Sequence, residues 1–185
     1  QTQTILKVER VAIKKTELYA SLWASCDELR GGMDASQYKN YILSLLFVKY
    51  VSDKYSGQKY GAIEIPEGGS FADMVAADGQ ADIGDRLNKV VGALAKANDI
   101  DWMQSADKDF NNEDRLGKGK AMVDTLSKLV RIFDGLDLGR NQADGDDLMG
   151  DAYEYLKRHF ATESGKSKGQ FYTPACLTSA PTGQI

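Results

Sequence analysis

The sequence is poor in cysteine, proline and histidine. Its 185 residues include 2 cysteines, 1 histidine and 3 prolines, in a composition that is 42% apolar and 27% charged, as in an ordinary globular protein. Cys26 and Cys176 lie far apart and have neither a metal-ligand nor a redox spacing. We therefore expect no disulfide framework, and a reducing cytoplasm as the compartment.

The sequence also has no long hydrophobic run. Its most apolar stretch, the 11 residues 41–51, contains Ser44 and Lys49, whereas a helical membrane span needs about 20 residues. Charged residues interrupt any signal-peptide core near the N-terminus. These absences predict a soluble, cytoplasmic protein without a membrane partner.

An excess of positive charge is missing as well. Lysine and arginine together number 23 and the acidic residues 27, so the formal net charge is −4. A domain that binds DNA on its own usually has a basic stripe, and none is evident along this chain. The charge balance therefore disfavours autonomous DNA binding, but it allows a contribution to a larger DNA clamp.

Apolar residues at helical spacing are abundant instead. Leu18, Leu22, Cys26 and Leu29 predict a helix that ends at the glycine pair 31–32. Asp34 and Gln37 then have the spacing of a capping box, which predicts the start of a second helix over about 36–55. That helix is apolar over most of its circumference, as is typical of the central helix of a bundle. The aromatics at these positions are assigned to packing: Trp23, Tyr38, Tyr41 and Phe47.

The remaining chain is predicted to be helical too. Further helices are expected at about 70–77, 83–94, 122–133 and 146–160, with an irregular segment at 98–118 anchored by Trp102 and Phe110. At most a short strand or hairpin is expected near 60–66. There is no repeat and no alternating series of strands, so the fold class is all-α, a multi-helix orthogonal bundle. Residues 1–15 would form a polar arm and residues 16–162 the helical domain.

Two segments carry a family resemblance. Near the C-terminus, DLMGDAYEYL at 147–156 is followed by Phe160, a loop of glycine, lysine and serine, and GQFYTP at 169–174. Upstream, LW at 22–23, DELRG at 27–31, MDASQYK at 33–39 and LFVKYVSDKY at 46–55 form a second group. Both resemble the N-terminal helical domain of the modification (methyltransferase) subunit of type I restriction-modification systems, an adenine-specific DNA methyltransferase family. The two groups lie in the family's order at both ends of residues 18–174.

The resemblance implies a function for the intact protein: methylation of adenine in DNA with S-adenosyl-methionine. It implies four partners, namely DNA, a specificity subunit, a second modification subunit and an endonuclease subunit. In the family the aromatic-Thr-Pro box lines the cofactor pocket, so the resemblance assigns cofactor binding to Gln170, Phe171, Tyr172, Thr173 and Pro174. The residues alone leave an alternative open, in which these aromatic rings merely pack a chain terminus.

The chain departs from the family after this box. Residues 175–185 have no helical apolar period, and the Asn-Pro-Pro motif that would hold a flipped adenine occurs nowhere in the sequence. We therefore expect residues 163–185 to be a linker and the start of a truncated methyltransferase domain. This fragment would contain no catalytic residue and would be inactive by itself.

Other polar residues have simpler interpretations. Lys166 and Lys168 do not complete a phosphate-binding loop, and we expect them in a flexible linker that contacts the DNA backbone. His159 is expected to stabilise a helix C-terminus. Acidic residues at 144, 146 and 147 lack the spacing of a calcium loop, so no metal is expected. Two rival functions remain: a helical docking module without cofactor or DNA contact, and a helical domain that binds DNA alone.

Overall fold

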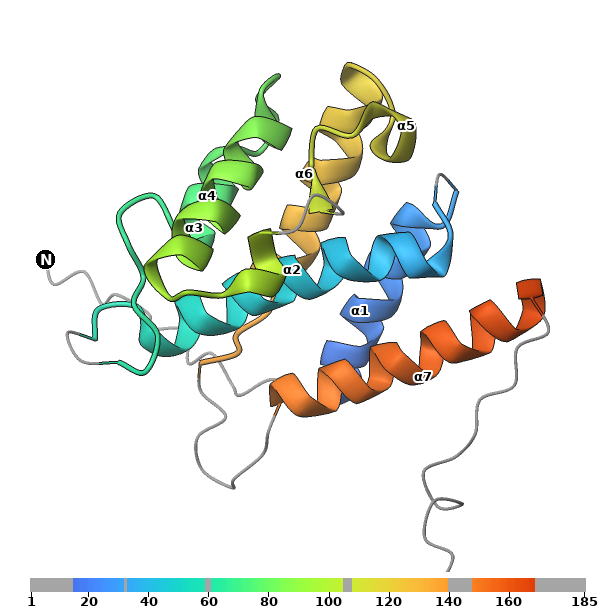
Figure 1. Cartoon of the computed structure of the whole chain (residues 1–185), viewed down its shortest axis with the longest axis horizontal. Helices are drawn as coiled ribbons and strands as arrows, with labels where there is room; N and C mark the ends of the chain where they lie inside the picture. Colours follow the sequence, from blue (N-terminus) through green and yellow to red (C-terminus); the bar gives the residue numbers. More distant parts are fainter. Residues whose placement is uncertain (1–14, 32, 59–60, 105–107, 140–147, 169–185) are drawn as a thin grey trace, which may run out of the picture.

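The regular structure of this protein is helical. The computed structural model describes residues 15–31, 33–58, 61–104, 108–139 and 148–168, and every regular element within these ranges is a helix, which confirms the all-α class (Figure 1). The elements are α1 (Lys15–Leu29), α2 (Ala35–Tyr55), α3 (Phe71–Ala76), α4 (Ile83–Ala97), the short 3₁₀ helix η1 (Asp101–Gln104), α5 (Glu113–Leu116), α6 (Lys120–Asp134) and α7 (Leu148–Lys168).

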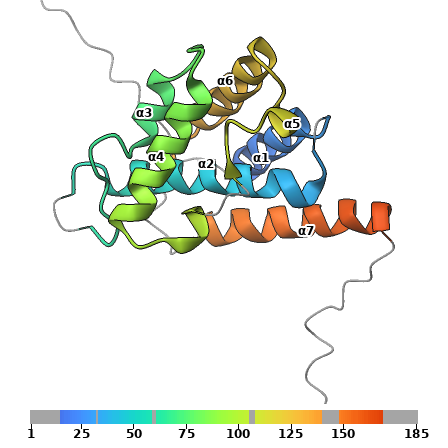
Figure 2. The same cartoon turned by 45° about the horizontal axis from the view of Figure 1, so that its top comes forward.

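Helix α2 is the centre of the bundle. It contacts α1, α3, α4, α6 and α7, and it lies between α7 on one side and the layer of α3 and α4 on the other (Figures 1 and 2). Its apolar side chains face several neighbours at once, which explains why the helix is apolar nearly all round. Those that are fully buried include Tyr38, Tyr41, Ile42 and Leu45. The prediction of a central helix is confirmed.

Side-chain caps fix where the helices begin. The backbone N–H of Gln37 donates to Asp34 Oδ1 at 3.2 Å, and the N–H of Asp34 donates to Gln37 Oε1 at 3.3 Å. This is the capping box expected from the sequence. Ser70 and Asp73 form a second one at the start of α3, so both helices start where local chemistry satisfies their first N–H groups.

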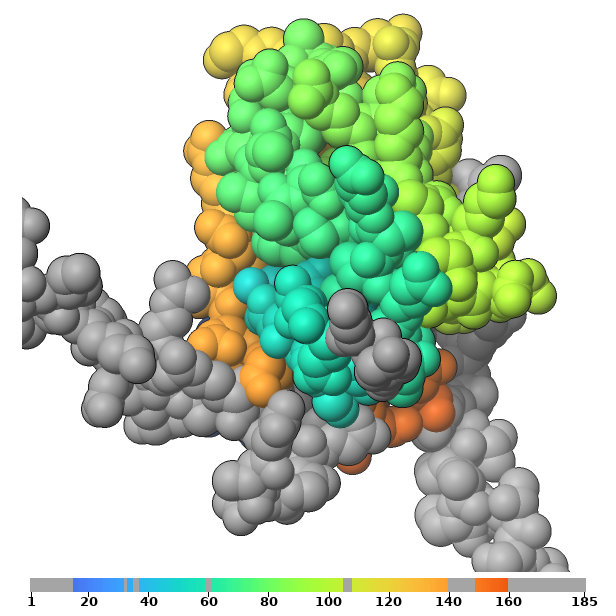
Figure 3. Space-filling model, turned by 90° about the vertical axis from the view of Figure 1, so that its left-hand side faces the viewer, coloured from blue at the N-terminus to red at the C-terminus, as the bar shows by residue number. Residues whose placement is uncertain are grey.

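The strand considered near 60–66 does not form. Residues 61–66, which the structure describes, run as bends and loop, and the segment between α2 and α3 lies on the surface that faces the viewer in Figure 3. The Asn98 side chain satisfies the backbone there: Glu64 N–H donates to Asn98 Oδ1 at 2.8 Å, and Asn98 Nδ2 donates to the Glu64 carbonyl at 2.7 Å. An amide side chain at the end of α4 thus takes the role that a neighbouring strand would have.

The two tryptophans, Trp23 and Trp102, lie partly exposed at the surface. Trp23 is 45% exposed, so its assignment to packing was wrong, and Trp102, which was expected to anchor residues 98–118, is 44% exposed. The segment around Trp102 is anchored by Phe110, which is fully buried and meets the Tyr41 ring edge-on at 5.2 Å. Trp102 instead covers Phe47, with ring centroids 5.6 Å apart. Helical spacing shows which face carries a ring, but not how deeply the flank of that face is buried.

Helix α7 is longer than expected. It continues past residue 160 to Lys168, so the predicted loop of residues 163–168 is helical. A single glycine such as Gly165 weakens a helix by about 1 kcal/mol relative to alanine but does not end it. His159 consequently lies in the middle of α7 and cannot stabilise its C-terminus. No helix within the described residues combines the length and apolarity that crossing a membrane requires.

Candidate functional site around helix α7

Helix α7 ends at Lys168, just before the predicted cofactor box in the sequence. It contacts α1 and α2, and it extends along one side of the bundle (Figure 1). Ala152 and Leu156 form the buried face of the helix, with exposures of 0% and 1%. Their spacing of four residues places them on one side of α7. The helix is therefore part of the hydrophobic core and not an appendage.

A ladder of side-chain pairs joins α7 to α1. Lys15 Nζ lies 2.8 Å from Asp151 Oδ2. The rings of Tyr19 and Tyr155 are stacked, with centroids 4.6 Å apart and planes within 7°, and Trp23 meets His159 in a T-shaped contact, also at 4.6 Å. On both helices the three residues are four positions apart and follow the same order. The two helices therefore run parallel along this contact.

The middle pair of the ladder is the most enclosed. Tyr155 is half-buried, and burial raises the pKa of its hydroxyl above the usual 10.0, with smaller contributions in the same direction from Cys26 and Tyr19. His159 lies parallel to the Tyr155 ring at 6.4 Å. The end of the ladder is more open, where the Arg30 guanidinium lies 5.1 Å above the Trp23 ring. The seam between α1 and α7 is thus aromatic and partly accessible to water.

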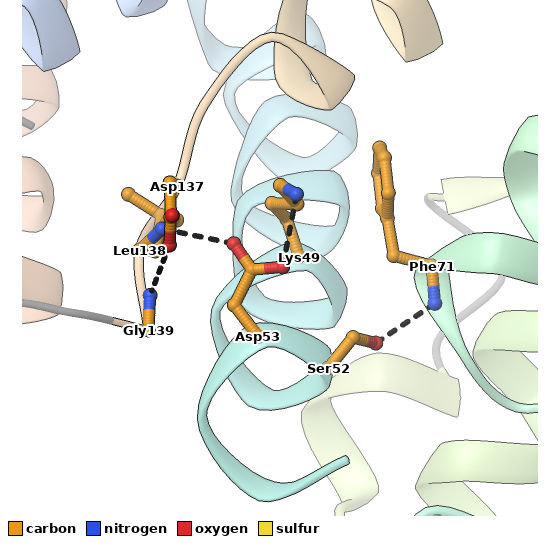
Figure 4. A network of polar contacts seen from close by, with 7 residues as sticks. All are labelled: Lys49, Ser52, Asp53, Phe71, Asp137, Leu138 and Gly139. Carbon is orange, nitrogen blue, oxygen red and sulfur yellow. Dashed lines mark hydrogen bonds and ion pairs between the residues drawn. The ribbon is translucent and has the colours of Figure 1, made fainter. Parts of the chain in front are cut away.

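A polar clasp holds the segment that leaves α6 (Figure 4). Lys49 Nζ and Asp53 Oδ1 form an ion pair at 2.9 Å, and the other Asp53 oxygen accepts the backbone N–H of Leu138 at 2.9 Å. A Cβ atom at Gly139 would lie 2.6 Å from the Asp53 carbonyl oxygen, so only glycine permits this approach. Asp53 thereby ties the exit from α6 to the last turn of α2.

The same turn of α2 also fixes the start of α3. The backbone N–H of Phe71 donates to Ser52 Oγ at 2.8 Å within a buried contact (Figure 4). Consecutive residues Ser52 and Asp53 therefore hold two loops that are far apart in sequence. This is a scaffold arrangement, because both side chains are occupied by backbone partners.

The predicted cofactor residues Gln170, Phe171, Tyr172, Thr173 and Pro174 lie outside the residues that the structure describes. Lys166 and Lys168 belong to the last turns of α7, where only the backbone is described. The acidic residues at 144, 146 and 147 are also outside the described ranges, and within those ranges no three His, Cys, Asp or Glu side chains are grouped as metal ligands. The assignment of the cofactor box stays a prediction.

A groove of about 550 Å³ lies between α6 and the loop before α4. Three cationic side chains line it, and each forms an ion pair with a carboxylate: Lys120 with Asp124, Lys128 with Glu28, and Arg131 with Asp78. The Arg131 pair is bidentate, and this hydrogen bonding lowers the pKa of Asp78 below its usual range. Because neighbouring carboxylates balance its positive charge, the groove is a poor site for phosphate.

Sequence reasoning missed the ladder. Each of the two helices shows its i, i+4, i+8 series in the sequence, and a series of this kind indicates a shared face. Nothing local pairs the face of Lys15, Tyr19 and Trp23 with that of Asp151, Tyr155 and His159, because the two series are separated by most of the chain. Only the folded arrangement brings them together.

Comparisons with known proteins agree on one family. A family model described as the HsdM N-terminal domain matches residues 18–133, and one described as N-6 DNA Methylase matches residues 144–180. The chain is 32% identical over 167 residues to the type I restriction enzyme StySPI methylase subunit of Salmonella potsdam, covering 89% of this chain. It is also 32% identical over 168 residues to the EcoKI methylase subunit of Escherichia coli K12.

A solved structure has the same architecture. The crystal structure of the methyltransferase subunit of a type I restriction-modification system from Streptococcus thermophilus superposes with a TM-score of 0.67 at 26% identity, covering 88% of this chain and 42% of that one. The chain spans 29% of the length of the StySPI and EcoKI subunits. The similarity thus covers nearly all of this chain and a minor part of its relatives.

Proposed function

Because the chain belongs to the family of type I restriction-modification methylase subunits, we propose that it forms the helical N-terminal part of an enzyme that transfers a methyl group from S-adenosyl-methionine to adenine in DNA. The observation that carries the proposal is the position of α7. This helix lies within the region that matches the N-6 DNA methylase model, packs into the core of the helical domain, and ends just before the aromatic-Thr-Pro box.

In this proposal the box forms one edge of the methyl-donor pocket. Phe171 and Tyr172 offer flat faces that suit a methionine side chain or an adenine ring, and Thr173 offers a hydroxyl. Pro174 biases Thr173 towards an extended backbone, which suits a pocket edge. Gln170 completes the set that the resemblance assigns to the cofactor.

The transfer step itself needs residues that this sequence does not contain. The amino group of adenine is inaccessible within a duplex, so the base must be flipped out and held. The family does this with an Asn-Pro-Pro motif, which is absent from the 185 residues. We therefore expect this chain alone to be inactive, and the intact protein to be a site-specific adenine methyltransferase.

The helical domain would contribute to a DNA clamp and to contacts with other subunits, namely a specificity subunit, a second modification subunit and an endonuclease subunit. Its net charge of −4 and the paired cations of the α6 groove favour a role that depends on partners. Lys166 and Lys168, close to the box, are the residues we propose for contacts with the DNA backbone, which position a protein without reading sequence.

Calorimetric titration with S-adenosyl-methionine tests the proposal. We expect no tight binding by the 185-residue chain, and micromolar or tighter binding by a version extended to the length of the StySPI subunit. Replacing Phe171 and Tyr172 by alanine in the extended protein should weaken binding at least ten-fold. The matched control is Tyr153→Ala, because this exposed tyrosine lies on the outer surface of α7.

The rival function is a helical docking module with no cofactor or DNA contact. It predicts that the extended protein binds no donor, or that the Phe171 and Tyr172 substitutions leave donor affinity unchanged. Either result would overturn the proposed function. A shift of nonspecific duplex DNA by the 185-residue chain at physiological salt would instead favour a helical domain that binds DNA alone.

A further inference from the structure

We propose that the ladder between α1 and α7 sets the register of α7 and thereby positions the aromatic-Thr-Pro box. The ladder consists of the pairs Lys15–Asp151, Tyr19–Tyr155 and Trp23–His159. Its residues touch no donor in this proposal, so they are positioning residues and not catalytic ones. The inference rests on the proposed function for its consequence, although the ladder itself can be tested without a donor.

The chemistry of the three pairs specifies one register. They are an ion pair, a stack of two tyrosines, and an edge contact between tryptophan and histidine, in that order. Sliding α7 by one turn would bring Asp151 against the Tyr19 ring and would leave Lys15 without its carboxylate. Three identical apolar pairs would tolerate such a slip, as apolar seams of coiled coils do unless a polar position fixes the register. The mixed ladder therefore has one favourable alignment.

Burial of one face of α7 stabilises the docking of this helix on the bundle, and the ladder sets its alignment. Ala152 and Leu156 are excluded from water, whereas Trp23 is 45% exposed and the side chains of Lys15 and Asp151 are 44% and 36% exposed. Small apolar residues such as Ala152 can fit several positions of a groove between helices. The more exposed pairs add less burial but more directional contacts. Loss of one pair should therefore shift or loosen α7 without unfolding the bundle.

The register matters because the box follows α7 closely. Helix α7 ends at Lys168 and the box begins at Gln170, so little chain is available to absorb a displacement. A slip of one helical turn would move the end of α7 by about 5.4 Å. Misplacement of a binding group by about 1 Å already weakens a preorganised site severely. The alignment at α1 would thus be transmitted along α7 to the donor pocket.

The test is a charge-swap cycle in two proteins. Lys15→Glu, Asp151→Lys and the double variant are made in the 185-residue chain and in the extended protein. In the short chain, hydrogen exchange of α7 amides reports docking. In the extended protein, titration reports the affinity for S-adenosyl-methionine. Each single variant should raise α7 exchange and weaken donor binding by three- to ten-fold, and the double variant should restore both to within two-fold.

A matched control keeps the effect of charge apart from the effect of the ladder. Lys157→Glu reverses an exposed charge that pairs with Glu154 within α7, at 3.8 Å, and does not reach α1. It should leave exchange and donor affinity unchanged. The thermal midpoint should be recorded for every variant. If the ladder has a merely structural role, donor affinity should fall only in step with the midpoint.

The outcomes distinguish the two proposals. If single variants loosen α7 but donor affinity does not change, the ladder does not position the box and the inference is wrong. If the double variant fails to restore the exchange of the α7 amides, the Lys15–Asp151 pair does not set the register and the inference is wrong. If the unsubstituted extended protein binds no donor, the proposed function is wrong, and so is the positioning role. The hydrogen-exchange measurements in the short chain still decide whether the ladder aligns α7.

Discussion

At the scale of single residues, two glycines of α4 have opposite roles. A Cβ at Gly84 would lie 2.5 Å from the Phe110 carbonyl oxygen, whereas a Cβ at Gly92 would meet nothing within 4 Å. We predict that Gly84→Ala destabilises the protein by about 2 kcal/mol through overpacking. Gly92→Ala should stabilise it by about 0.5–1 kcal/mol because alanine is the better helix former. Urea unfolding measures both, and equal effects of the two substitutions would contradict the prediction.

Asp53 is the residue whose loss should cost most among the polar side chains of the clasp. Asp53→Ala leaves Lys49, whose side chain is only 9% exposed, without its ion-pair partner, and removes the acceptor of the Leu138 N–H. Breaking such a pair from one side destabilises by about 3 kcal/mol. Denaturant unfolding should show this loss, with Asp82→Ala as the control, because the Asp82–Arg86 pair lies at the surface. Little or no change on Asp53→Ala would show that the clasp is dispensable.

At the scale of elements, Tyr155 makes the docking of α7 sensitive to alkaline pH. Burial raises the pKa of its hydroxyl in the folded protein, so the unfolded chain loses this proton at a lower pH than the folded chain does. The contribution is fully present below the ordinary pKa of 10.0 and is lost as the pH rises through the higher folded value. We therefore predict that stability falls as the pH rises past 10.0, and that Tyr155→Phe reduces this fall.

Denaturant unfolding at a series of pH values from 8 to 11 measures the effect. Tyr153→Phe is the control, because Tyr153 is exposed on the same helix and should leave the alkaline fall in place. The same fall in the wild type and in Tyr155→Phe would mean that Tyr155 is not the group responsible.

The helices also show which parts of the fold could be predicted from the sequence. Capping at Asp34 and the apolar spacing of α1, α2, α4 and α6 are local features, and the helices they predict are present. Local patterns failed near Glu64, where no strand forms because the distant Asn98 side chain satisfies the backbone. They also failed at Gly165, because a single glycine does not end α7. The pairing of Tyr19 with Tyr155 is of the same kind. The cofactor box came from resemblance and lies outside the described residues, so it stays a prediction.

At the scale of the whole molecule, sequence families and packing divide the chain differently. The model of the HsdM N-terminal domain ends at residue 133, and α7 falls within the region matched to N-6 DNA methylase. In space, however, α7 belongs to the helical bundle, because Ala152 and Leu156 are buried against it and Tyr155 stacks on Tyr19. The packing of α7 therefore joins it to the helical domain, and the predicted boundary of that domain at residue 162 stays a prediction.

A shortened chain tests that boundary. A protein that ends at Gly139 lacks α7 and exposes the apolar surface of α1 and α2 that Ala152 and Leu156 cover, so we predict a loss of about 3 kcal/mol in the free energy of unfolding, or aggregation. A peptide of residues 148–168 added in trans should restore stability in a concentration-dependent way. A chain that ends at Lys168 is the control and should match the full chain. If the chain ending at Gly139 were as stable as that control, α7 would be an extension of the methylase region that only rests on the bundle.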